Sequence, residues 1–457
     1  MSGQAARAPE PRRAPRLGVG SRLSWWLAPG LFGCALLPGH VATGLLVAYN
    51  GLLILLWLWD ARRLFAVELA VTRELATSHH HLSSVTYHQV IESRFPEGLR
   101  LWVEDELPAS FERAQSVHRL ELAGLAKARS TLSFVPVERG VFTLQETALK
   151  IERKWGLSSL TRSLPCADTV RVLPRLPRAE HAPRLRRRQL GSVAARLSHA
   201  PRGREFEALR EYVPGDSMRD VDWKATAKRG RPVTRTYRPE RSQTLWLVLD
   251  ASRSMTLPSG SGPQRGRAIH HTRFDASVQA ALQLADSALR AGDRVGLLVF
   301  SSEQELCVPP SRGSRHYVRL LHALTPRRAH PRHFNPRALV QQLCTRARKR
   351  ALVVVFTDLD NESEADLFIE HAPALTRRHV VTCVSLIDRE AEQTLDRVPE
   401  TDADAFLKAA TIDLSNERER IQSRLHGLGV QVAHAHPGAL AQAALDQYFA
   451  VKLSGRL

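Results

Sequence analysis

Oxygen-bearing side chains follow an apolar stretch of the C-terminal half at a spacing suited to binding a metal ion. Asp250, Ser252 and Ser254 come directly after the apolar run Leu245–Leu249. Such a run predicts a strand buried on both faces of a parallel sheet, and these sheets bind ligands at the carboxyl ends of their strands. A carboxylate and two hydroxyls are hard donors that suit Mg²⁺, Mn²⁺ or Ca²⁺. The alternative is that one of them caps the next helix or closes a local turn.

A second apolar run, Ala351–Phe356, is also followed by a carboxylate, that of Asp358. Strand-like and helix-like patterns alternate throughout this half, which predicts a mostly parallel, doubly wound α/β sheet. Asp250 and Asp358 are then expected at the same edge of that sheet. The other predicted elements are strands at Arg294–Phe300, Val380–Leu386 and Val430–Ala433, and helices at Phe274–Arg290, Tyr317–Leu324, Pro336–Arg348, Asp404–Leu425 and Gly438–Val451.

Composition narrows the class of protein. The chain has 457 residues, enough for about three domains, and its net charge is +19, from 65 Lys and Arg against 46 Asp and Glu. Such an excess suits nucleic acid, anionic lipid or an acidic protein partner. Aromatic residues make up only 6%, which argues against a stacking platform for single-stranded nucleic acid. The five cysteines form no C-x-x-C pair, which argues against a zinc ribbon or a disulfide framework.

The N-terminal region predicts a membrane anchor. Residues 1–22 are basic and Pro-rich, as in a disordered tail. Leu23–Trp59 then contains no Asp, Glu, Lys or Arg, and Pro38-Gly39-His40 divides it. The second half, Val41–Trp59, is long enough to cross a hydrocarbon layer of roughly 30 Å. The tryptophans of the segment stand near its outer ends, where indoles favour the membrane interface: Trp25, Trp26, Trp57 and Trp59.

Arginines on both flanks orient this anchor. Arg22 precedes the apolar segment and Arg62 and Arg63 follow it. Positive residues stay on the cytoplasmic side, so both flanks comply only if 23–59 is a transmembrane helical hairpin. This predicts that the N-terminus and the C-terminal domains lie on the cytoplasmic side of the membrane. The alternative is one crossing with an interfacial first half.

Between the anchor and the sheet domain, the chain changes character twice. Residues 60–175 contain short alternating runs separated by turn residues, which predict a small β-sandwich. Within them, His79–His81 is expected to be a solvated polar turn rather than a metal site. Residues 176–240 begin as a basic linker, which suits lipid headgroups, nucleic acid or a simple solvated connection.

The end of that linker region is the most distinctive segment of the chain. Acidic and basic residues alternate around Tyr212 and Trp223, and either Asp220 or Asp222 is expected to cap a short helix through Lys228. The charges form either a folded ion-pair network or an exposed recognition surface, and dense pairing favours the network. The signature residues are Arg210, Tyr212, Pro214, Gly215, Asp216, Arg219, Asp222, Trp223 and Lys224.

This segment, followed at once by the Asp250-x-Ser-x-Ser254 strand end, resembles a bacterial family called domain of unknown function 58. The strand end itself resembles the metal-ion-dependent adhesion site of von Willebrand factor A domains. The resemblance implies Mg²⁺ or another divalent cation held by Asp250, Ser252, Ser254 and Asp358. A-type domains usually add a threonine from a middle loop. That position falls near His333, where no threonine stands, and the nearest threonine is Thr325. The alternative is therefore a degenerate site that no longer binds the metal.

The resemblance also implies an architecture and a location in the bacterial inner membrane. A transmembrane hairpin and a small β-sandwich precede a von Willebrand A-like, Rossmann-like domain. The expected boundaries are 1–22 for the tail, 23–59 for the hairpin, 60–175 for the β-sandwich, 176–240 for the linker and signature segment, and 241–457 for the A-like domain.

The function expected from this combination is a non-enzymatic, metal-dependent binding or assembly module. Proteins resembling the family are often paired with MoxR-type AAA+ ATPases, which implies such an ATPase and a client protein as partners. One alternative is a membrane-bound hydrolase using Asp250 and Ser252, with His270, His271 or His333 as base. The other is nucleic-acid binding through the basic linker. The sequence has no G-x-x-x-x-G-K-[ST], H-E-x-x-H or G-x-S-x-G motif.

Overall fold

The computed structural model divides the protein into two compact units, Met1–Leu173 and Pro174–Leu457. Each unit is described below by itself. The described residues are 14–34, 39–113, 117–174, 205–213, 218–238, 243–259, 271–358, 362–387 and 389–454.

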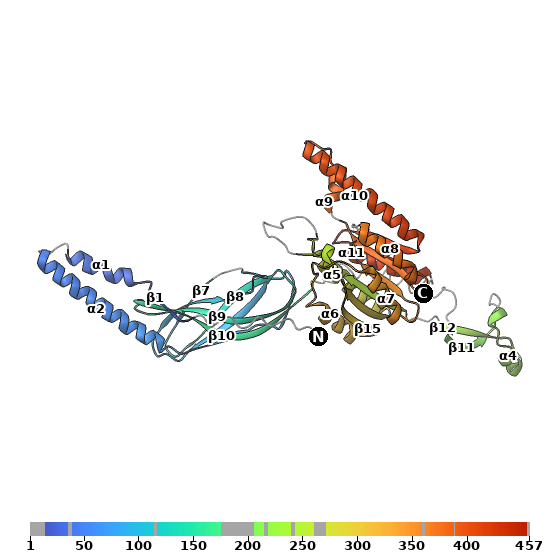
Figure 1. Ribbon diagram of the computed structural model, residues 1–457. Coiled ribbons are helices and arrows are strands. Elements are labelled where there is room, and N and C mark those ends of the chain that lie inside the picture. Colours follow the sequence, from blue (N-terminus) through green and yellow to red (C-terminus); the bar gives the residue numbers. More distant parts are fainter. Residues whose placement is uncertain are drawn as a thin grey trace. The chain divides into compact units, whose positions relative to one another are not determined.

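Two apolar helices near the N-terminus lie side by side (Figure 1). They are α1 (Leu23–Cys34) and α2 (Gly39–Phe65), and the Tyr49 hydroxyl on α2 donates a hydrogen bond to the Trp26 carbonyl on α1. By length and composition, Thr43–Phe65 is a candidate membrane span. Helix α1 has 12 residues, or roughly 18 Å of helix, against a hydrocarbon layer of roughly 30 Å. Of the two predicted crossings, the described residues therefore supply one candidate span.

The strands of the first unit form two sheets around a shared core. One sheet has the order β1-β10-β9-β5-β7, with β3 paired to β10, and the other has the order β2-β4-β8-β6. Apolar side chains of both sheets, including Tyr87, Ile91, Leu101 and Ile151, belong to a single buried cluster. The strands are β1 (Arg16–Val19), β2 (Leu69–Glu74), β3 (Ser78–His80), β4 (Val85–Ser93), β5 (Leu99–Asp105), β6 (Phe111–Arg113), β7 (His118–Leu122), β8 (Lys127–Pro136), β9 (Gly140–Arg153) and β10 (Ser158–Leu173).

The histidine triplet does not form the predicted solvated turn. His79 and His80 belong to β3, which pairs in parallel with the end of β10. His81 is buried, and its Nε2 is 2.7 Å from the Val137 carbonyl oxygen. The turn prediction was wrong because backbone pairing with β10, distant in sequence, recruits the segment into the sheet.

A buried polar network joins the two sheets. Asp105 on β5 accepts hydrogen bonds from Arg73 on β2, at 3.0 Å, and from Gln89 on β4, at 2.6 Å. The Tyr87 hydroxyl and the Thr147 hydroxyl each donate to the same carboxylate at 2.5 Å. The charge is both paired and hydrogen-bonded, as a buried carboxylate requires. The network therefore fixes how the sheets face each other.

In the second unit, the signature segment forms a two-stranded hairpin. Strand β11 (Glu205–Glu211) pairs antiparallel with β12 (Val233–Arg238). Between them lie η1 (Met218–Asp220) and the short helix α4 (Trp223–Arg229). Asp222 caps α4 by accepting a 3.0 Å hydrogen bond from the Ala225 amide, which confirms the predicted cap.

The rest of the second unit is built on a six-stranded sheet of order β15-β14-β13-β16-β17-β18. All neighbouring strands are parallel except β14 and β15. Along β13 the buried side chains alternate between two core clusters: Leu247 joins one and Val248 the other. The strands are β13 (Thr244–Asp250), β14 (Arg294–Phe300), β15 (Gln304–Ser311), β16 (Leu352–Phe356), β17 (Val380–Leu386) and β18 (Val430–Ala435).

Helices cover both faces of this sheet (Figure 1). Phe274 on α5 and Tyr448 on α11 belong to one cluster, and Leu339 on α7 and Phe368 on α8 belong to the other. The helical elements are η2 (Arg253–Thr256), α5 (Arg273–Arg290), α6 (Ser314–Leu324), α7 (Pro336–Arg346), α8 (Glu362–Thr376), α9 (Arg389–Asp396), α10 (Asp402–Gly427) and α11 (Leu440–Ser454).

Candidate functional site

The strands β13 and β16 carry Asp250 and Asp358 to the same edge of the six-stranded sheet. The two strands are parallel neighbours, and Leu249 pairs with Phe356 in register. Asp250 ends β13, and Asp358 follows the end of β16 by two residues. The alternation of apolar runs predicted this shared edge, and the register places both carboxylates there.

Asp250 is fully buried and held from two sides. One carboxylate oxygen accepts a hydrogen bond from the Ser252 amide at 2.8 Å, and the other accepts from the Thr357 hydroxyl at 2.7 Å. The Ser252 and Ser254 hydroxyl oxygens lie 3.3 Å apart. Sequence reasoning missed Thr357, which brings a third hydroxyl to the edge. Its position directly before Asp358 is the one signal that points to it.

Asp358 is buried as well, but its two oxygens differ. Oδ2 forms an ion pair with the guanidinium of Arg273, the first residue of α5. Oδ1 is buried and has no hydrogen-bond partner among the described residues. Burying a carboxylate oxygen without a hydrogen-bond partner lowers the stability of the fold. This oxygen is therefore the atom of the site that most needs a further positive or donor group.

The electrostatics of Asp250 favour a cation. The pKa of Asp250 is raised from 3.8 to about 6: burial is the main cause and the nearby Glu364 carboxylate on α8 adds to it, while the Thr357 and Ser252 hydrogen bonds oppose the shift. Because the folded-state pKa lies above the unfolded value, ionisation destabilises the fold as the pH rises from 3.8 through about 6. The cost at neutral pH is on the order of 3 kcal/mol, at about 1.4 kcal/mol per pKa unit. A bound cation would offset this cost.

The loop before α7 lies against the residues that follow β13. The His330 amide donates to the Ala251 carbonyl, and the Arg253 amide donates to the Arg332 carbonyl, each at 2.8 Å. This loop carries no threonine. Thr325 lies at the end of α6, where its hydroxyl donates to the Leu321 carbonyl.

Each of the described candidate bases lies near another polar side chain. His271 Nδ1 lies 2.6 Å from the Ser259 hydroxyl, and His333 Nδ1 lies 3.9 Å from a carboxylate oxygen of Glu364. His270 falls outside the described residues. In the part of the chain with described coordinates, no three His, Cys, Asp or Glu side chains converge as a metal-binding group. A cation at this edge would depend on the two carboxylates together with the hydroxyls.

The signature segment is partly structural. Asp222 pairs with Arg235 at 2.9 Å as well as capping α4, and the Ala225 amide is the main cause of its lowered pKa. Arg210, Trp223 and Lys224 are exposed, and Tyr212 is half-buried. The Trp223 side chain is 64% exposed. Pro214, Gly215 and Asp216 lie outside the described residues, as does the side chain of Arg219. The structure therefore supports both interpretations of the segment. Asp222 belongs to a local ion-pair network, and Trp223 faces solvent, as an exposed recognition surface requires.

Residues 208–427 match the family described as protein of unknown function DUF58. The chain belongs to the DUF58 family. The matched range includes most of the signature segment and the whole Asp250–Asp358 edge.

Relatives of this DUF58 chain include uncharacterized proteins of two bacteria. YeaD of Bacillus subtilis is 24% identical over 239 residues, which are 52% of this chain and 53% of YeaD. Mb1516 of Mycobacterium bovis is 24% identical over 188 residues, which are 41% of this chain and 56% of Mb1516. The chain thus spans about half the length of the curated relatives it matches.

Among solved structures, the chain is similar to the conserved hypothetical protein BatB from Bacteroides thetaiotaomicron. Identity is 17%, and the match covers 47% of this chain and all of the BatB chain, with a TM-score of 0.30. A TM-score this low does not establish a shared fold.

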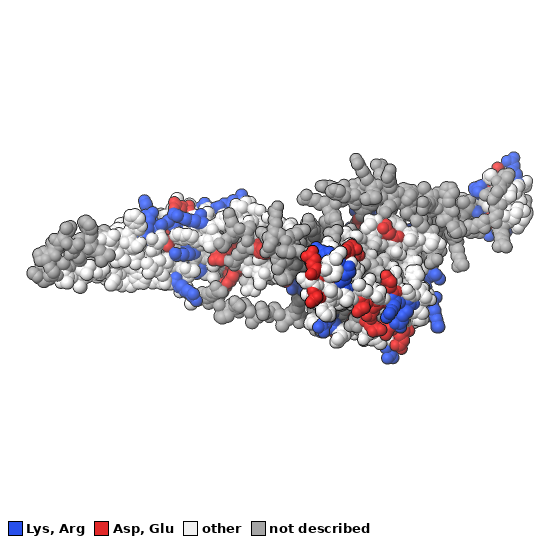
Figure 2. Space-filling model, turned by 90° about the horizontal axis from the view of Figure 1, so that it is seen from above, with Lys and Arg blue, Asp and Glu red and all other residues white. Residues whose placement is uncertain are grey.

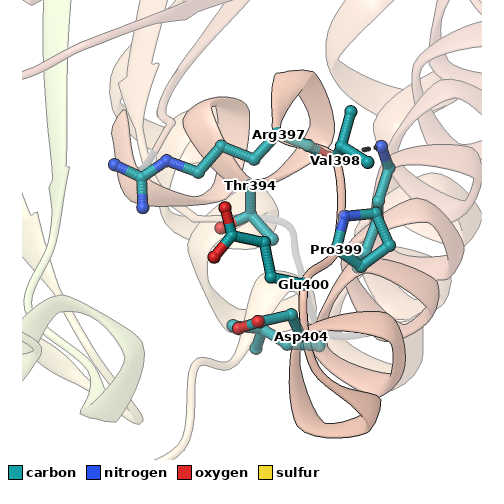
Figure 3. Close-up of a pocket in the computed structure, with 8 residues that line it drawn as sticks. Thr394, Arg397, Val398, Pro399, Glu400 and Asp404 are labelled. Atoms are coloured by element: carbon teal, nitrogen blue, oxygen red, sulfur yellow. Dashed lines mark hydrogen bonds between the residues drawn. The ribbon is translucent and has the colours of Figure 1, made fainter.

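The DUF58 chain also has a cavity of about 440 Å³ between α9 and α10, shown in Figure 3. Two of its charged side chains, Asp404 and Lys408, already serve the local fold. Asp404 forms a capping box with Thr401, and the Lys408 ammonium donates to the Arg397 carbonyl at 2.8 Å. The cavity is lined by other elements than those of the Asp250–Asp358 edge, so it adds no residue to that site.

Proposed function

We propose that this DUF58 chain is a membrane-anchored, non-enzymatic binding or assembly module. Its C-terminal part is proposed to be a doubly wound, von Willebrand A-like domain that holds a divalent cation at Asp250, Ser252, Ser254 and Asp358. The strand order, with one antiparallel edge strand and helices on both faces, supports this assignment. The cation would present an open position to a carboxylate of a partner protein.

One observation carries the proposal. Two buried carboxylates from neighbouring strands meet at one sheet edge beside paired hydroxyls, and one oxygen of Asp358 has no partner among the described atoms. The residues present fit Mg²⁺ or Mn²⁺, because both ions take carboxylate and hydroxyl oxygens. When bound, the cation would supply positive charge to a partner's acidic side chain, and the chain's own residues would fix its place.

The alternatives have less support. A hydrolase using Asp250 and Ser252 needs a base, whereas His271 Nδ1 lies beside the Ser259 hydroxyl and His333 is an exposed side chain 3.9 Å from Glu364. Nucleic-acid binding would depend on the basic linker, most of which lies outside the described residues. The candidate span Thr43–Phe65 supports anchorage, and flanking arginines favour a cytoplasmic position for the sheet domain.

We propose a MoxR-type AAA+ ATPase and its client as the partners, and the test is capture from native bacterial membranes. Full-length protein is crosslinked with Mg²⁺ present or with a chelator, and captured proteins are quantified by mass spectrometry. At least a tenfold loss is expected with chelator and in Asp250→Asn and Asp358→Asn. Asp446→Asn, an exposed carboxylate on α11, is the matched control and should capture normally. Equal capture by all variants, with and without chelator, would remove the cation from the function.

Arg273 is expected to compete with the cation. Its guanidinium already pairs with Asp358, so a metal ion must share or displace that contact. Arg273→Ala should tighten Mn²⁺ binding by about tenfold, or about 1.4 kcal/mol, as measured by calorimetry on the full chain in detergent.

Arg290→Ala is the control for this prediction. Arg290 is the last residue of the same helix, and it forms an exposed pair with Asp286. Its replacement should leave Mn²⁺ affinity unchanged. If Arg273→Ala binds Mn²⁺ no better than the wild type, then Arg273 does not compete for the site.

A further inference from the structure

The turn between β9 and β10 lies beside the first turn of α1. The Trp155 and Trp26 rings stack with centroids 5.7 Å apart. The Arg22 amide donates to the Gly156 carbonyl at 3.1 Å, and the Gly20 amide donates to the Leu157 carbonyl at 3.0 Å. A Cβ on Gly20 would lie 2.2 Å from the Gly156 oxygen. The backbone at Gly20 therefore lies so close to the β9–β10 turn that only glycine fits at this position.

A buried ion pair fixes the same turn to α2. Asp60 accepts from the Arg153 guanidinium at 2.7 Å and from the Ser158 hydroxyl at 2.6 Å. Arg153 and Asp60 are 2% and 1% exposed, so neither charge has water as a substitute partner. The Arg153 guanidinium also lies 5.0 Å from the centre of the Trp59 ring. The two ends of the turn are thus bonded to both helices.

These contacts determine the depth of the turn relative to the part of α2 that carries no charged side chain. From Gly39 to Trp59, α2 contains no Asp, Glu, Lys or Arg. That is about 21 residues, or roughly 31 Å of helix, which matches a hydrocarbon layer of roughly 30 Å. Asp60 then marks the membrane surface, and the residues bonded to it lie at the same level.

The exposed side chains at this level suit lipid headgroups. Trp155 is 54% exposed and Trp59 is 50% exposed, and indoles favour the membrane interface. Figure 2 shows blue basic side chains beginning where the uncharged surface of the helices ends. The exposed basic residues around the turn are Arg22, Arg62, Arg63 and Lys154. Lys and Arg near a membrane surface attract anionic lipids.

We propose that the β9–β10 turn, Lys154–Gly156, is a second membrane contact that binds anionic lipid headgroups. It rests on the proposed anchorage by α2 and adds a site on the β-sheet domain itself. The span and the turn together would hold this domain at a fixed height and tilt on the bilayer, because a single transmembrane helix can tilt and would carry the domain with it.

The test places a photo-crosslinking benzoylphenylalanine in the full chain, reconstituted in nanodiscs containing phosphatidylglycerol. Three positions are compared: 155, 141 and 54. Val141 is 51% exposed, as Trp155 is 54% exposed, and it lies at the opposite end of β9, the strand that leads into the turn. Ile54 is 58% exposed on α2 and reports the span. Lipid adducts are quantified by mass spectrometry.

Position 155 is expected to yield at least five times more lipid adduct than position 141, and replacing phosphatidylglycerol with phosphatidylcholine should reduce the yield at 155. Equal yields at 155 and 141, with strong labelling at 54, would overturn the second contact and leave the anchor intact. No adduct at 54 would overturn the anchorage and this proposal together. If the adduct yield at position 155 is the same with phosphatidylglycerol and with phosphatidylcholine, the turn does not bind anionic headgroups specifically.

Discussion

Replacing Arg153 with methionine is expected to destabilise the first unit by about 3–5 kcal/mol, the usual cost of leaving one partner of a buried pair unpaired. The Asp60 carboxylate would keep only the Ser158 amide and hydroxyl, and Glu97 would lose its contacts with the guanidinium. The helical pair should then separate from the β9–β10 turn. Thermal unfolding and hydrogen exchange of the Ser158 amide, on the full chain in nanodiscs, measure both effects.

Two variants check this expectation. Arg153→Lys keeps the charge but cannot reach Asp60 and Glu97 together, so an intermediate loss is expected. Arg129→Met removes an arginine whose pair with Glu74 is exposed on both sides, and the expected loss is below about 1 kcal/mol. Arg153→Met matching Arg129→Met would show that the buried pair does not hold the helices to the sheet.

Asp293→Ala is expected to have a comparable effect on the second unit. The Asp293 carboxylate accepts from the Lys452 ammonium at 2.6 Å, from the Tyr448 hydroxyl, and from the Gln243 amide at 3.0 Å. Burial and the Asp293 charge raise the pKa of Tyr448. Removing the carboxylate leaves a buried ammonium, at a cost of about 3–5 kcal/mol, or roughly 10 °C in melting temperature for a domain of this size.

The matched rescue is the double variant Asp293→Leu with Lys452→Met, which replaces the pair with apolar groups of similar length. It should recover part of the loss, because the Tyr448 hydroxyl and the Gln243 backbone amide still lose their acceptor. Asp366→Ala, in an exposed pair with Arg424, is the surface control and should shift melting by little. Calorimetry on the full chain measures all three. A single variant as stable as the surface control would contradict a structural role for the cluster.

The shared edge of Asp250 and Asp358 could be predicted because long apolar runs mark central parallel strands, whose carboxyl ends point the same way. The antiparallel edge strand β15 was missed. It contains Pro309 and Pro310, which weaken a strand pattern and confine it to an edge. Helices α8 and α9 were missed as well, and α8 has Pro373 in its interior.

The partners of the site residues were harder to predict. The edge also receives side chains from β16, α5 and α8, namely Thr357, Arg273 and Glu364, because these elements pack around β13. No local sequence pattern predicts such contacts. The same holds for the pair of Asp60 and Arg153, which are 93 residues apart in sequence. Periodicity predicts elements, whereas the choice of a polar partner depends on tertiary packing.

The length of β10 has a consequence for the reach of the protein. This strand starts at Ser158, bonded to Asp60, and runs for 16 residues to Leu173. At about 3.3 Å per residue it extends roughly 50 Å. If Asp60 marks the lipid boundary, the first unit acts as a rigid spacer, and the polypeptide leaves it up to that distance from the bilayer. Shortening β9 and β10 in register should therefore lower the exit point by about 7 Å for each pair of residues removed per strand.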